Sequence, residues 1–263
     1  MDILSFITGG LPLWTLFVIC PMLFLAGLVD AIGGGGGLIS LPAYLLCGLP
    51  AHLTIATNKL SSSMGTSVAT FRYARRGYIP WKTAGAAVVC GLLGSTVGAH
   101  LSLIASERFL MIFMLIALPF VGGYVIWKKD LSSDKPAFGT AKTMALCMAI
   151  AFGVGVYDGF YGPGTGTFLM LLLCGLARLD VFKAQGVTKA INLTTNVTAL
   201  VVFLLNGQVL IGLGLVAGVF NIAGNYVGAS LFSNKGSAIV RPVILVVVII
   251  FSIRLALQLA GIA

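Results

Sequence analysis

Two lysines in this sequence stand within apolar stretches, each beside hydroxyl and amide side chains. If both stretches are helical, the side chains three and seven positions after each lysine fall on nearly the same face. The polar neighbours are Asn58, Ser62 and Thr66 around Lys59, and Thr188, Asn192 and Asn196 around Lys189. Lysine supplies positive charge, and Ser, Thr and Asn donate hydrogen bonds to oxygen, so the pattern suits an oxyanion. The alternative is that these side chains hydrogen-bond one helix to another.

A glycine-rich turn follows each of two aspartates. Asp30 precedes residues 33–37, which are all glycine, and Asp158 precedes residues 162–166, Gly-Pro-Gly-Thr-Gly. A helix that begins at such a turn directs unpaired N–H groups and the positive end of its dipole toward an anion. We therefore expect substrate contacts from Gly34, Gly35, Gly36 and Gly37 in the first turn and from Gly164, Thr165, Gly166 and Thr167 in the second. The alternative is that the glycines only allow helices to pack closely.

The aspartates have two candidate roles beside the lysines. A lysine inside a membrane is costly unless it is paired or hydrated, so it indicates a functional site. The alternative is that each lysine only forms a salt bridge to Asp30 or Asp158. The aspartates could also carry a coupling proton. Both roles are compatible if an aspartate releases its lysine when an anion arrives.

The elements that must position these residues are membrane helices. Of the 263 residues, 59% are hydrophobic and only 9% are charged, and no soluble surface can be built from that composition. Apolar stretches of roughly 20 residues can cross the ~30 Å hydrocarbon layer. We predict such spans at residues 84–105, 109–127, 143–157, 209–232 and 242–259. The fold class that follows is an all-α polytopic membrane protein.

The chain also repeats itself at an offset of about 130 residues. Residues 27–30, 46–49 and 94–99 match residues 155–158, 173–176 and 224–229 in the same order. Each repeat predicts a long helix ending at the aspartate, the glycine turn, a short helix, the lysine helix and two further spans. The short helices, at residues 38–49 and 167–176, would cover only about half of the hydrocarbon layer. We therefore expect a broken or re-entrant helix pair in each repeat, with its turn near the midplane.

The basic residues predict that the two repeats have opposite orientations. Cytoplasmic loops collect Lys and Arg, and the loop after the first lysine helix, at residues 72–82, is basic. In the second repeat the basic loop precedes the lysine helix, at Arg178 and Lys183. The predicted organisation is a first inverted repeat at 1–128, a cytoplasmic linker at 129–142 and a second inverted repeat at 143–263, with both chain ends outside. Topology thus accounts for the net charge of +9, and we expect no binding of nucleic acid.

Four motifs in this chain resemble those of the TauE/SafE sulfite exporter family. They are Asp30-Ala31-Ile32 before the first glycine turn, Ala56-Thr57-Asn58-Lys59-Leu60, Tyr73-Ala74-Arg75-Arg76-Gly77, and residues 157–166 around the second turn. The resemblance covers nearly the whole chain. It implies a carrier of the bacterial inner membrane that moves sulfite, sulfonates or related sulfur-containing anions, generally outward.

These observations predict a transporter rather than an enzyme, with no cofactor and no metal. The expected mechanism is alternating access, with an anion held between the two glycine turns by the helix N-termini, Lys59 and Lys189. The alternatives are an anion channel with the same site, a membrane enzyme acting on a sulfur compound, and a scaffold without transport. Gly85, Gly91, Gly94 and Gly98 could pack helices within one chain or between chains, which leaves a homo-oligomer open.

Overall fold

The structure is a computed structural model that describes residues 3–127, 138–232 and 249, and within these ranges the chain is all-helical. The helices are α1 (Ile3–Thr8), α2 (Trp14–Gly33), α3 (Gly37–Leu46), α4 (Ala51–Arg75), α5 (Trp81–Ile104), α6 (Glu107–Trp127), α7 (Thr140–Phe160), α8 (Thr165–Gly175), α9 (Val181–Leu205) and α10 (Ile211–Leu231). Five of them, α2, α5, α7, α9 and α10, are long and apolar enough to cross a membrane. The all-α prediction is confirmed for the described residues. The predicted span at 242–259, apart from residue 249, and most of the predicted linker at 129–142 lie outside them.

The N-terminal apolar region is divided, whereas the sequence predicted one long helix ending at Asp30. Gly9 and Gly10 have positive φ angles of 66° and 83° after α1, a conformation that ends a helix and that glycine adopts without a Cβ clash. The chain then restarts as α2 at Trp14 and continues three residues past Asp30. The short helix α1 packs against the start of α10.

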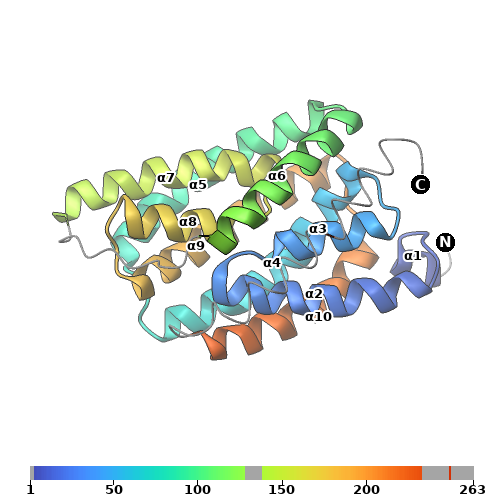
Figure 1. Ribbon diagram of the computed structural model, residues 1–263, viewed down its shortest axis with the longest axis horizontal. Coiled ribbons are helices and arrows are strands. Elements are labelled where there is room, and N and C mark those ends of the chain that lie inside the picture. Colours follow the sequence, from blue (N-terminus) through green and yellow to red (C-terminus); the bar gives the residue numbers. More distant parts are fainter. Residues whose placement is uncertain (1–2, 128–137, 233–248, 250–263) are drawn as a thin grey trace.

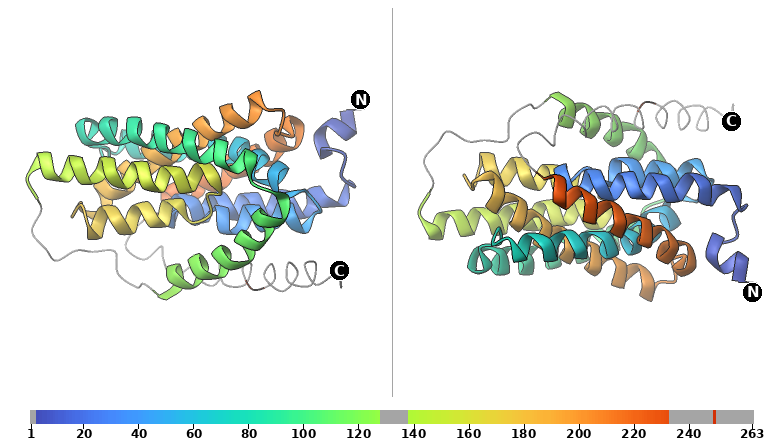
Figure 2. Two further views of the ribbon diagram at one scale, coloured as in Figure 1. Left: turned by 90° about the horizontal axis from the view of Figure 1, so that it is seen from above. Right: turned by 90° about the horizontal axis from the view of Figure 1, so that it is seen from below.

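Long helices from the two halves of the chain pack in reciprocal pairs. The helix α5 lies along α7, and α10 lies along α2 (Figure 2). A Cβ added at Gly94 would lie 2.2 Å from the Phe152 carbonyl oxygen, and one at Gly224 would lie 2.0 Å from that of Phe24. Small residues therefore bring these helix backbones into direct contact, as in many membrane proteins. Gly91 and Gly98 also serve packing within the chain, whereas a Cβ at Gly85 would meet no atom within 4 Å.

The lysine helices α4 and α9 run through the inside of this bundle and contact each other. Lys59 and Lys189 are only 1% and 0% exposed. The short helices α3 and α8 are also buried, and they begin near the middle of the molecule and run toward opposite ends (Figure 1). The turns that precede these two helices are also largely buried.

The outside of the bundle is apolar. Large side chains such as Phe17, Ile104 and Leu205 are 80%, 80% and 83% exposed. A soluble protein rarely exposes apolar side chains on this scale, whereas lipid-facing helices require them.

Candidate functional site

The two glycine turns touch each other in the centre of the structure. Gly34, the residue after α2, has φ 76°, and a Cβ there would lie 2.3 Å from the carbonyl carbon of Gly166. The Thr167 hydroxyl donates a hydrogen bond of 2.7 Å to the Gly33 carbonyl oxygen. The break between α2 and α3 is therefore fastened to the break between α7 and α8. Because the backbones are in contact at this point, the space for a ligand lies beside the contact.

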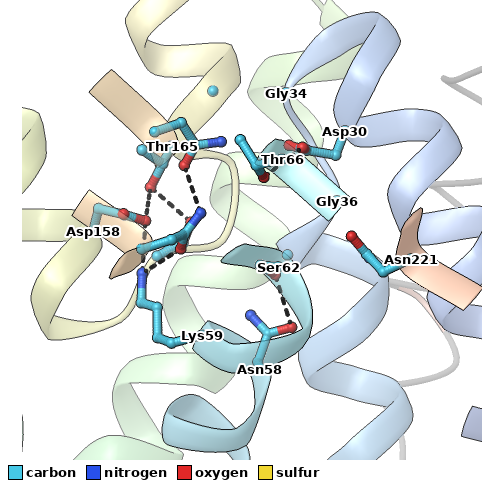
Figure 3. A pocket seen from close by; sticks show the side chains of 15 residues that line it. Asp30, Gly34, Gly36, Asn58, Lys59, Ser62, Thr66, Asp158, Thr165 and Asn221 are labelled. Carbon is cyan, nitrogen blue, oxygen red and sulfur yellow. Dashed lines mark hydrogen bonds and ion pairs between the residues drawn. The ribbon is translucent and has the colours of Figure 1, made fainter. Parts of the chain in front are cut away.

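That space is a small polar cavity at the junction of both breaks (Figure 3). Its walls come from the α2–α3 turn, α4, the end of α7, the start of α8, α9 and α10. The cavity volume is about 20 Å³. This exceeds the roughly 10–15 Å³ that one ordered water needs by the same measure, so the cavity can hold water or a small ion.

Most of the residues predicted for the site line this cavity. Those that do are Asp30, Gly34, Gly36, Gly37, Asn58, Lys59, Ser62, Thr66, Asp158, Thr165, Gly166, Asn192 and Asn196. Five predicted residues are not part of the lining: Gly35, Gly164, Thr167, Thr188 and Lys189. Thr167 instead joins the two breaks, and the buried hydroxyl of Thr188 has no hydrogen-bond partner among the described residues.

Lys59 is the cation of the cavity wall. Its Nζ lies 3.0 Å from Asp158 Oδ1 and donates to Asn196 Oδ1 at 3.1 Å. The Asn196 amide in turn donates to Asn192 Oδ1 at 3.1 Å. Charge from Lys59 and hydrogen-bonding groups from α9 thus converge on one side of the cavity.

Lys189 lies behind the cavity in a second ion pair. Its Nζ is 2.7 Å from Asp30 Oδ2 and donates to the Asp30 carbonyl oxygen at 2.5 Å. The hydroxyl of Thr66 donates to the same carboxylate oxygen at 3.4 Å. Each lysine is therefore paired with the aspartate of the opposite half of the chain.

Sequence reasoning missed two residues of the wall, Gly162 and Asn221. Gly162 stands in the second glycine turn, so its position in the turn was a usable signal. Asn221 belongs to α10, where it donates to the Leu23 carbonyl oxygen at 3.1 Å. An amide within an otherwise apolar span was the available signal for Asn221, because such a side chain must find a partner. Within the described residues, no group of three His, Cys, Asp or Glu side chains is arranged to hold a metal ion.

A comparison with protein families identifies the chain. The family model described as Sulfite exporter TauE/SafE matches residues 19–255. The chain belongs to the TauE/SafE sulfite exporter family. The resemblance of the four motifs is thereby confirmed, and no solved structure matches the chain significantly.

Several curated relatives align with this TauE/SafE chain over most of their length. A protein of Sinorhizobium sp named "Probable membrane transporter protein ORF9" is 37% identical over 235 residues, covering 88% of each chain. "Probable membrane transporter protein YfcA" of Escherichia coli K12 is 31% identical over 251 residues, covering 92% of each. A "Probable membrane transporter protein" of Haemophilus influenzae is 30% identical over 226 residues, covering 85% of this chain and 87% of its own. Together with the apolar helices, these matches identify a multi-pass membrane transporter and not an enzyme.

Proposed function

We propose that this transporter moves small oxyanions of the sulfite or sulfonate type across the bacterial inner membrane, generally outward. The observation that carries the proposal is the buried cavity in which Lys59 meets amide and hydroxyl groups from several helices. A buried lysine is costly in a membrane and is retained where it has a function. The word "sulfite" in the family description supports the choice of cargo.

The size and chemistry of the cavity favour a compact anion. Asn, Ser and Thr side chains donate to oxygen, and a charged donor makes hydrogen bonds roughly twice as strong as neutral ones. The short helices add the positive ends of their dipoles. Some of their first N–H groups already donate to turn carbonyl oxygens, Leu38 to Gly35 and Thr165 to Gly162. Because Lys59 is held by Asp158, an arriving anion must compete with that carboxylate. The aspartates tune the lysines or carry a coupling proton.

We also propose that the two halves are inverted repeats that alternate in access to the site. Helices α2 to α5 and α7 to α10 follow the same order of one long, one short and two long elements. The packing of α5 on α7 mirrors that of α10 on α2, and the lysine–aspartate pairs cross between the halves. Inverted halves with broken helices around a central site are typical of secondary transporters. With basic loops in the cytoplasm, this topology places both chain ends outside.

Flux into proteoliposomes tests the proposal. Purified protein should give saturable uptake and counterflow of at least one anion from a panel of sulfite, sulfate, thiosulfate and small sulfonates. The double variant Lys59→Met/Lys189→Met should abolish that flux while it still elutes as a single species in detergent. Undiminished flux through the folded double variant would refute the site.

The main alternative is an anion channel that uses the same cavity. A channel shows no counterflow, whereas a carrier exchanges labelled for unlabelled anion. A dependence of uptake on an imposed pH gradient would identify proton coupling.

A further inference from the structure

The two lysine–aspartate pairs have the same composition but different contacts. Lys189 Nζ binds both the Oδ2 atom and the main-chain oxygen of Asp30, at 2.7 and 2.5 Å. Lys59 Nζ instead contacts side-chain oxygens, Asp158 Oδ1 at 3.0 Å and Asn196 Oδ1 at 3.1 Å. Only Lys59 of the two belongs to the cavity wall. Lys189 is therefore bound in part to the main chain, whereas the contacts of Lys59 are to side chains.

The main-chain contact places Lys189 at the broken end of α2. The last carbonyl groups of a helix have no partner within it, and at this end side chains from other helices supply the donors. Tyr73 Oη and Gln185 Nε2 both donate to the Ala31 carbonyl oxygen, at 2.8 and 2.7 Å. Lys189 adds a side-chain donor to the Asp30 carbonyl oxygen, which also accepts from the Gly34 N–H at 2.9 Å. It is thus one of several groups that hold the end of α2 against α4 and α9.

Asp158 has a hydrogen-bond donor besides its lysine. The hydroxyl of Thr165 donates to Asp158 Oδ1 at 2.7 Å and would remain after Lys59 moved away. The second oxygen, Oδ2, is buried and has no hydrogen-bond partner within the described part of the chain. Displacement of Lys59 toward the cavity therefore breaks side-chain contacts and leaves the end of α7 in place.

We infer that the two pairs have different roles in the transport cycle. An oxyanion in the cavity takes the place of Asp158 on Lys59, which becomes its charged ligand. The Lys189–Asp30 pair stays closed and acts as a positioning latch on the end of α2. The inference rests on the proposed anion transport. The sequence predicts that Lys59 and Lys189 both bind the anion, whereas the inference gives that role to Lys59 alone.

Single and charge-neutral double variants test this division. The Lys59 set is Lys59→Met and Lys59→Met/Asp158→Asn, and the matched Lys189 set is Lys189→Met and Lys189→Met/Asp30→Asn. A single variant leaves one buried charge unpaired and can fail to fold for that reason. Each double variant removes both charges of one pair and so avoids this effect. KM and the maximal rate are measured in proteoliposomes for the anion that the wild type moves best, and the thermal unfolding midpoint is measured in detergent.

Loss of Lys59 should raise KM about 30-fold or more, because a charge-assisted bond to the anion is lost, and Lys59→Arg should recover part of it. Loss of Lys189 should lower the unfolding midpoint by roughly 10 °C and reduce the maximal rate, with a KM within about threefold of the wild type. An equal rise in KM for both sets, or an unchanged midpoint without Lys189, would overturn the division of roles. If the wild type moves no anion of the panel, the proposed function itself fails.

Discussion

The two helix breaks contain similar residues but are held in different ways. At the end of α2, the carbonyl oxygens of Asp30, Ala31 and Gly33 accept hydrogen bonds from side chains of α4, α8 and α9. At the end of α7, the contacts to carbonyl oxygens are local. Tyr157 Oη donates to the Pro163 carbonyl oxygen at 2.6 Å. Thr165 Oγ1 lies 2.7 Å from the Gly162 carbonyl oxygen and shares its single proton between that oxygen and Asp158 Oδ1. The carbonyl oxygens of the first break thus accept hydrogen bonds from other helices, whereas those of the second accept from its own residues. The second break is still joined to the first through Thr167 and to α4 through the Asp158–Lys59 pair.

This difference bears on how a transporter of this kind could work. On the proposed anion transport, a bound anion shifts the protein between two states only as far as its affinities for those states differ. We propose that the first break, with donors from three other helices, keeps its position between the states. The second break carries Asp158, whose lysine lines the cavity.

The largest expected effect is a loss of stability on substitution of a turn glycine, and it should differ between the two breaks. Gly34→Ala places a Cβ 2.3 Å from the backbone of Gly166 at a φ of 76°, so we expect a loss of roughly 3 kcal/mol or more in stability. At Gly162, φ 101°, the added Cβ would meet Lys59 Nζ at 3.0 Å and Asp158 Oδ1 at 2.9 Å. Gly162→Ala should therefore cost about 1–2 kcal/mol in stability, less than Gly34→Ala, and mainly raise KM.

Denaturation with sodium dodecyl sulfate and proteoliposome kinetics measure the two quantities. Gly77→Ala is the matched control, since Gly77 has φ 74° and its Cβ would meet no atom within 4 Å. If Gly34→Ala costs no more than this control, the contact between the two turns is not structural.

An intermediate effect is expected from the two threonines near the start of α8. Thr167→Val removes the hydroxyl that binds Gly33 across the breaks and should lower stability by about 1 kcal/mol. Thr165→Val removes the donor to Asp158 Oδ1 and should strengthen the hold of Asp158 on Lys59, so that KM rises several-fold. Both variants keep nearly the same shape, which makes each the control for the other. A larger change in KM for Thr167→Val than for Thr165→Val would reverse the comparison.

The smallest effect is expected from two tyrosines. Tyr157→Phe removes the hydroxyl donor to Pro163 and should cost about 1 kcal/mol in stability. Tyr73→Phe should cost less than that, because the Ala31 carbonyl oxygen keeps its second donor, Gln185 Nε2. Denaturation curves of the two variants give the ranking directly. If Tyr73→Phe lowers stability more than Tyr157→Phe does, the Gln185 donor does not compensate for the lost Tyr73 hydroxyl at the end of α2.

Much of the site follows from local sequence. Lys59, Asp30 and Asp158 are conspicuous because charge is rare in an apolar chain, and the glycine turns mark breaks because glycine adopts positive φ without strain. Polar side chains at helical spacing from Lys59 and Lys189 indicated which faces point inward, and Asn58, Ser62, Thr66, Asn192 and Asn196 do line the cavity. Asn221 escaped notice because it lies on a different helix, far from both lysines in sequence.

The sequence by itself therefore determined a membrane-embedded helical chain, two broken helices, and the charged and polar groups near them. The tertiary structure alone decided that each lysine meets the aspartate of the other half, across 99 and 159 positions of the chain. It also decided that Lys59 lines the cavity while Lys189 holds the end of α2. The physical reason is that the two lysine segments share the same local pattern. Which partner each amine reaches depends on how α2, α4, α7 and α9 pack, and that arrangement is set by contacts between distant helices.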